Sequence, residues 1–157
     1  MVKINFKDAV NNPSKIVTKM GNVTTVTLKG TIKEFDWNII PEEVLEWIAL
    51  QPRIELYEED GITTIYSRAS SQCHPKDHYN SVLGERIAES RTKYRIYKFL
   101  FNLYTKIINY YSLILYGHIT PEVDVTQGIL ADKNKCEHLY RQELTHIRKL
   151  ISDNNHE

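Results

Sequence analysis

The strongest constraint on the fold of this chain is a change of hydrophobic period between residues 72 and 77. Before this point apolar and β-branched residues alternate with polar ones, which is the period of strands. After it apolar and aromatic residues recur every three or four positions, which is the period of helices. No linker rich in Gly or Ser separates the two patterns among the 157 residues. We therefore expect one α+β domain, with a β-rich part (1–72) and a helical part (77–153).

Two antiparallel hairpins are expected in the β-rich part. Alternating residues flank Gly30 within 23–35, so we expect the first hairpin to turn at this glycine. Asp60 and Gly61, a favoured two-residue turn, interrupt the alternation within 53–66 and predict the second hairpin. Both hairpins would contribute to one antiparallel sheet.

A short helix is expected between the two hairpins, over residues 41–50. Pro41 suits a first helical position because its φ is fixed near the helical value and its missing N–H would be unpaired there. Acidic residues follow in the first turn, where they complement the helix dipole.

A heptad seam marks the helical part and predicts a long helix over 77–116. Its apolar and aromatic positions alternate gaps of four and three from Leu83 to Leu115. Gly84 lies in the first turns, where glycine is unfavourable, so we expect another backbone to pack closely there. The seam residues that we expect to serve self-association or core packing are Tyr94, Tyr97, Phe101, Tyr104, Ile108 and Tyr111.

A last helix is expected over 132–152, antiparallel to the long helix and about half its length. It would leave part of the seam uncovered. The uncovered part would then meet the β layer, a second copy of the chain or a target protein, and we expect a homodimer. Additional apolar residues widen the stripe in the carboxy-terminal half of the long helix, which predicts that this half is buried on more than one side.

Charge is balanced overall but uneven along the chain. Lys and Arg number 20, as do Asp and Glu, and the pI is near 7.0. Residues 33–60 hold nine acids and two bases, whereas 76–106 hold seven bases and three acids. The candidate partner-binding residues therefore lie on a basic helix face and on an acidic face. The alternative is that these faces are simply solvated or packed on each other. They are Arg91, Arg95, Lys98, Glu42, Glu43 and Glu46.

No catalytic or cofactor motif is present, so we expect neither an enzyme nor a bound cofactor. The segments Cys73–His78 and Cys136–His138 together could form a Cys₂His₂ zinc site, but the close cysteine pairs typical of such sites are missing, and we expect no metal. Two distant cysteines favour a reducing compartment. No signal peptide and no membrane helix are expected, which predicts a cytoplasmic protein without membrane contact.

Residues 62–91 resemble a pattern in small proteins of phages and prophages. The pattern has a strand, then Cys-His-Pro-x-Asp at 73–77, an aromatic, and Gly-x-Arg-Ile-Ala at 84–88 with a following Arg. His78 and Tyr79 depart from it, as does the long Tyr-rich extension after Arg91. The resemblance implies a viral accessory protein acting in the host cytoplasm and no biochemical activity. The same residues are also explained as a strand–turn–helix joint.

The leading hypothesis is a stoichiometric binding protein that occupies a host protein, of the counter-defence or anti-CRISPR type. Its partner would be a host defence protein such as a CRISPR effector. The alternative is a nucleic-acid or nucleotide-binding module that uses the basic, Tyr-rich helix. A weaker possibility is an oligomer that sequesters a small signalling nucleotide. Nucleic acid is not favoured as the partner, because the charge is modest and no recognition motif is present.

Overall fold

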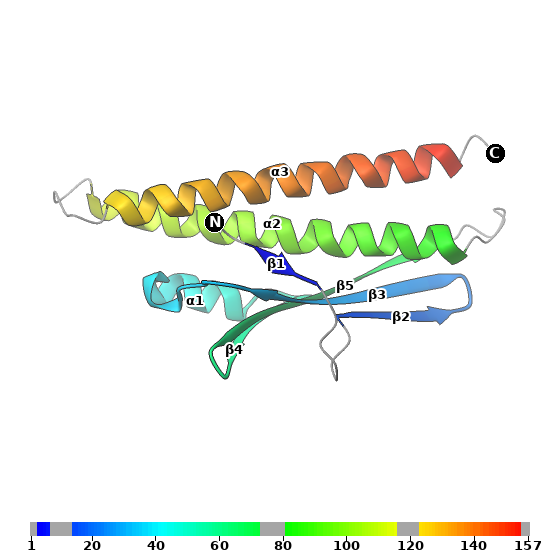
Figure 1. Ribbon diagram of the computed structural model, residues 1–157, viewed down its shortest axis with the longest axis horizontal. Helices are drawn as coiled ribbons and strands as arrows, with labels where there is room; N and C mark the ends of the chain where they lie inside the picture. The colour runs from blue at the N-terminus through cyan, green and yellow to red at the C-terminus, as the bar shows by residue number, and fades with distance from the viewer. Residues whose placement is uncertain (1–2, 7–13, 73–80, 116–122, 155–157) are drawn as a thin grey trace.

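The computed structural model describes residues 3–6, 14–72, 81–115 and 123–154. It shows an antiparallel sheet, a long helix α2 (Ser81–Leu115) against one face of the sheet, and a second long helix α3 (Val123–Asn154) on the far side of α2 (Figure 1). The predicted α+β class, with hairpins, one short helix and an antiparallel helical pair, is confirmed.

The sheet is built around two long central strands, β3 (Val23–Ile32) and β5 (Ile62–Gln72), which pair along their length. β4 (Ile54–Glu59) flanks β5, while β1 (Ile4–Asn5) and β2 (Lys15–Met20) flank opposite ends of β3. The predicted Asp60-Gly61 hairpin is confirmed. Both residues have positive φ, 53° and 77°, as the tight turn between twisted strands requires.

The hairpin predicted at Gly30 is wrong. β3 runs straight through this residue, which pairs with Ile65 of β5. Val26, Leu28 and Ile32 are all buried on the same face, so the alternation keeps its phase across the glycine and no turn is encoded. The hairpin preceding β3 turns instead after Met20, with Gly21 at φ 59°.

The short helix is confirmed as α1 (Glu42–Ala49). Pro41 is its N-cap and not its first helical residue, a difference of one position. Val44 and Ile48 of this helix are buried and Trp47 is half-buried, so α1 packs one apolar side against the core. A single 3-10 turn, η1 (Trp37–Ile39), precedes it.

α2 is buried on two sides, as the widened stripe predicts. Leu100, Leu103 and Ile107 are at most 1% exposed. Toward the sheet, the Thr92 hydroxyl donates to the Val26 carbonyl of β3 at 3.0 Å. Gly84 is a point of close approach, as predicted, but the neighbour is a side chain: a Cβ there would lie 3.2 Å from Thr24 Oγ1 of β3.

α3 is longer than predicted. It begins at Val123, nine residues before the predicted start at 132, so it runs beside nearly all of α2 (Figure 1). The β-branched residues and Gly128 near its start have low helix propensity, and packing overrides it. Ile129, seven residues before Cys136 and 5% exposed, continues the buried stripe. The expectation that the last helix is too short to reach part of the seam is therefore wrong.

None of the helices in the described part of the chain is apolar over a stretch long enough to cross a membrane.

Candidate functional site

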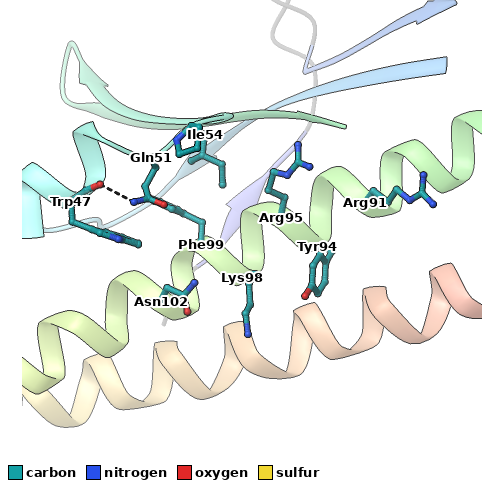
Figure 2. A pocket seen from close by; sticks show the side chains of 10 residues that line it. Trp47, Gln51, Ile54, Arg91, Tyr94, Arg95, Lys98, Phe99 and Asn102 are labelled. Carbon is teal, nitrogen blue, oxygen red and sulfur yellow. Dashed lines mark hydrogen bonds between the residues drawn. The ribbon is translucent and has the colours of Figure 1, made fainter. Parts of the chain in front are cut away.

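The three basic residues expected to bind a partner lie together on one pocket. Arg91, Arg95 and Lys98 project from α2, and with the segment joining α1 to β4 they enclose a space of about 340 Å³ (Figure 2). We call this the cationic pocket. Its other lining residues are Trp47, Gln51, Pro52, Ile54, Tyr94, Phe99 and Asn102.

The pocket contains no acidic side chain. Within the described part of the chain, Arg91, Arg95 and Lys98 form no ion pair with a carboxylate. The basic face of α2 is therefore not neutralised by ion pairs with the chain's own acidic segment among these residues, which was one of the two alternatives for it. Half-buried cations without a counterion attract an anion more strongly than fully solvated ones.

Two of the cations reach the edge of the sheet. Arg91 Nη1 donates to the Ser70 carbonyl at 3.0 Å, and Arg95 Nη1 donates to the Arg68 carbonyl. Both carbonyls belong to the part of β5 that extends past β4, because β4 begins at Ile54, opposite Ser67. A guanidinium has five N–H groups, so each arginine keeps donors for a further acceptor.

The start of β4 is set by the backbone at Arg53, the residue before the strand. Its φ of 71° is unusual for a residue with a side chain and turns the chain away from β5. Its carbonyl accepts a hydrogen bond from Ser67 Oγ at 2.7 Å, which fixes the turn. The pKa of Arg95 is lower than usual for an arginine, first because burial desolvates the guanidinium and second because the Arg53 charge repels it.

Lys98 directs its ammonium toward α3 (Figure 2). The Nζ atom lies 4.3 Å from the ring centroid of Tyr140 and 5.2 Å from that of Phe101, both within cation–π range. Lys98 therefore adds positive charge at the rim of the pocket while it also fastens α2 to α3.

An aromatic pair, Trp47 of α1 and Phe99 of α2, forms another wall of the pocket. The rings of Trp47 and Phe99 stack with centroids 5.3 Å apart and planes 5° apart. Gln51 Nε2 donates to the Trp47 carbonyl at 3.1 Å, so the chain after α1 folds back over the same wall (Figure 2). Arg and aromatic side chains in one partly desolvated pocket are the residue types that dominate binding at interfaces.

The acidic half of the predicted site lies elsewhere. Glu42, Glu43 and Glu46 are exposed on α1, and Glu43 lines a second space of about 300 Å³. Lys106 lines the same space, with its Nζ 5.1 Å from the Trp47 ring centroid. The structure thus brings the basic residues together and keeps the acidic ones outside the cationic pocket.

The predicted seam is covered only in part: Tyr104 is buried, and the other five seam residues are half-buried. Tyr94 and Phe101 contact the ring of Tyr140 on α3, at centroid distances of 5.9 and 5.4 Å. Tyr111 makes a different contact, because its hydroxyl donates a hydrogen bond to the Ile39 carbonyl at 2.5 Å. Burial raises the pKa of Tyr97 to about 12 and raises that of Tyr104 as well, and Ile108 packs against the same core.

Ser90 and His146 are near each other but lack the geometry of a catalytic relay. Ser90 Oγ lies 2.7 Å from His146 Nδ1, and the Glu143 carboxylate lies 3.8 Å from the same nitrogen. In a triad the serine and the carboxylate contact different ring nitrogens. Ser90 is also only 4% exposed, so this pair joins α2 to α3 and does not present a nucleophile.

The possible zinc site falls largely outside the described residues, because Cys73, His74 and the rest of 73–80 do so. Among the residues that the structure does describe, no group of three or more His, Cys, Asp or Glu side chains is arranged to hold a metal. Cys136 is fully buried, and burial raises its pKa to about 12, which disfavours the thiolate that binds metals.

The sequence interpretation missed Trp47, Gln51, Phe99 and Asn102. One signal was available: Asn102 continues the spacing of Arg91, Arg95 and Lys98 by one further step of four. The contribution of α1 had no such signal, since it depends on how α1 packs across α2. Fold and pocket together define an α+β protein with a cationic surface site. Comparison of the chain with protein families, with curated proteins and with solved structures found no significant match in any of the three.

Proposed function

We propose that this protein is a stoichiometric binding protein, not an enzyme, and that it holds an acidic segment of a partner protein in the cationic pocket. One observation carries the proposal: three cations line a pocket that contains no carboxylate. A partner's Asp or Glu side chains would supply the missing counterions.

The chemistry of the pocket suits a carboxylate. A guanidinium presents paired N–H donors whose geometry matches the two oxygens of a carboxylate. Each arginine now donates to a neutral backbone carbonyl, whereas a carboxylate would accept two parallel hydrogen bonds and would also neutralise the guanidinium charge. Trp47 and Tyr94 add apolar contact area beside the charges, as residues at interface centres do.

The identity of the partner is a further proposal. The resemblance of residues 62–91 to phage proteins favours a host defence protein in the host cytoplasm, so a counter-defence role is the version that we propose. The homodimer also stays a prediction. Its original motive, a seam beyond the last helix, no longer holds, so a dimer would have to use other surfaces.

The test compares proteins captured from a bacterial host lysate by three immobilised chains. These are the wild type, the double variant Arg91→Gln/Arg95→Gln, and the double variant Arg86→Gln/Arg148→Gln as a control. The control removes the same charge from exposed positions outside the pocket. Thermal melts establish that all three chains fold.

A specific partner should bind the wild type and the control equally. We expect its affinity for the pocket variant to fall by about tenfold or more, which corresponds to about 1.4 kcal/mol. Equal retention on all three chains, or no specific protein on any of them, would contradict the proposal.

A second candidate is a nucleotide or single-stranded nucleic acid, favoured by the aromatic rings beside the cations. Its signature is affinity for an oligonucleotide that falls steeply with added salt. Absence of such binding at low salt would remove this candidate.

A further inference from the structure

The sheet has an open edge beside the cationic pocket. β4 covers the flank of β5 only as far as Ser67, and no strand in the described part of the chain pairs with β5 on that side beyond it. The segment from Arg68 to Gln72 is therefore an edge, which we call the open edge.

The register shows which backbone groups face the open edge. The Lys29 N–H of β3 points away from β5, toward Ser14, so the even-numbered residues of β3 direct their N–H and C=O groups at β5. Their partners in β5 are odd-numbered, as in the pair Val26 and Ala69. The N–H and C=O groups of Ser70 consequently face the open edge.

Unpaired strand edges are sites where another strand adds, and proteins protect them with charged side chains. Here Arg91 and Arg95 do so, each with one donor on an edge carbonyl. A carboxylate can displace these edge carbonyls from the two arginines, because a guanidinium that moves from a carbonyl to a carboxylate keeps its number of hydrogen bonds.

We infer that the acidic partner segment binds as an extended strand added to the open edge, antiparallel to β5, with alternate carboxylates on Arg91 and Arg95. This inference rests on the proposed function and specifies how the partner is held. The occupant is an acidic peptide segment, and charge complementarity with the cationic pocket selects it.

The spacing of the two arginines matches this binding mode. Four residues along a helix advance by about 6 Å. Two residues along a strand advance by about 6.7 Å and bring the side chain back to the same face. Glutamates at every second position of an added strand would therefore meet Arg91 and Arg95 in turn, while the intervening side chains face away from α2.

The added strand would continue the line of β4 past Arg53. Its backbone would pair with Ser70, and its end nearest β4 would lie beside the wall formed by Trp47 and Phe99. Strand addition of this kind takes affinity from main-chain hydrogen bonds and specificity from alternate side chains.

The experiment uses fluorescein-labelled peptides and the full chain, with binding followed by anisotropy. The first peptide alternates Glu with Thr. A second has the same composition with its glutamates in one block, and a third has Gln in place of Glu. Two further copies of the first peptide carry backbone N-methyl groups, one on the Glu residues and one on the Thr residues.

We expect the alternating peptide to bind about tenfold more tightly than the block peptide, and the Gln peptide to bind weakest. Only one set of amides in an added strand faces β5, so N-methylation of one set should weaken binding by about tenfold while the other set is spared. The protein variant Ser70→Pro should give a similar loss, because it removes a donor from an edge where proline is tolerated.

The outcomes separate the two proposals. Equal binding of both N-methylated peptides, with dependence on Glu and on the two arginines retained, would overturn strand addition and leave the proposed function standing. No dependence on Glu in any peptide, or binding of a single-stranded oligonucleotide in place of the peptides, would overturn both.

Discussion

At the scale of single residues, Gly30 lets the N-terminal strand close over the sheet. A Cβ at this position would lie 2.6 Å from Ile4 Cγ2 and 2.9 Å from Phe6 Cε1. We expect Gly30→Ala to lower the free energy of unfolding by about 1–3 kcal/mol, the usual cost of overpacking. Urea unfolding followed by circular dichroism measures it.

Gly128 is the matched control for this substitution. Nothing lies within 4 Å of a Cβ placed there, and the residue is in α3. Gly128→Ala should raise the free energy of unfolding by up to about 1 kcal/mol, because alanine favours the helix. Unchanged stability of Gly30→Ala would show that the N-terminal strand does not pack on β3 as described.

Cys136 should be inert while the chain is folded. It is fully buried, and its pKa is raised to about 12, first by burial and second by the charge of Asp132. In a Cys73→Ser variant it is the remaining thiol. A thiol reagent at about pH 8 should therefore modify this variant only after denaturant is added, since the thiolate is the reactive form. Rapid reaction of the native variant would contradict this burial.

At the scale of elements, an ion pair joins β2 to α2. Lys15 Nζ lies 2.9 Å from Glu85 Oε1 and 3.2 Å from Glu89 Oε2, with the side chains about a third exposed. The hydrogen bond with Lys15 is the largest influence on the pKa of Glu85 and holds it below its ordinary value of 4.5, and the same bond raises the pKa of Lys15 above 10.5.

The direction of each pKa shift determines the pH range in which this pair stabilises the fold. The pKa of Glu85 is lowered in the folded state, so its contribution is present above pH 4.5 and is lost as the pH falls through the folded pKa. The pKa of Lys15 is raised, so its contribution is present below pH 10.5 and is lost as the pH rises through the folded pKa.

A double-mutant cycle with Lys15→Met and Glu85→Gln should give a coupling of about 0.5–1 kcal/mol near neutral pH, after allowance for solvent screening. The coupling should fade on acidification below pH 4.5, when the carboxylate takes up a proton in both states. Urea titrations of the four proteins at several pH values measure it. A coupling that grows with acid would contradict the pair.

Element prediction from the sequence succeeded where periodicity and turn chemistry agree. The Asp60-Gly61 hairpin and the two-sided burial of α2 were both predictable on these grounds. Element prediction failed where tertiary packing determines the local conformation. Gly30 resembles a turn residue until Phe6 is placed over it, and the start of α3 has poor helix formers that α2 nevertheless keeps helical.

At the scale of the whole molecule, overall neutrality conceals a polarised surface. The acids of residues 33–60 belong to α1, β4 and the turns around them, whereas Arg91, Arg95 and Lys98 gather on the cationic pocket. The sequence predicted the basic residues of the pocket, because their helical spacing is local. It did not predict Trp47 or the open edge, because these depend on how distant segments meet.

The most direct test of the central claim, that the cationic pocket takes an acidic segment, is the fluorescence of Trp47 in a Trp37→Phe variant, where it is the remaining tryptophan. Titration with the alternating Glu peptide should change its emission and saturate at one peptide per chain. The Gln peptide, or the further substitution Arg91→Gln/Arg95→Gln, should remove the change. Trp47 emission that does not change with the Glu peptide, or that changes equally when the two arginines are substituted, would contradict binding of an acidic segment in the cationic pocket.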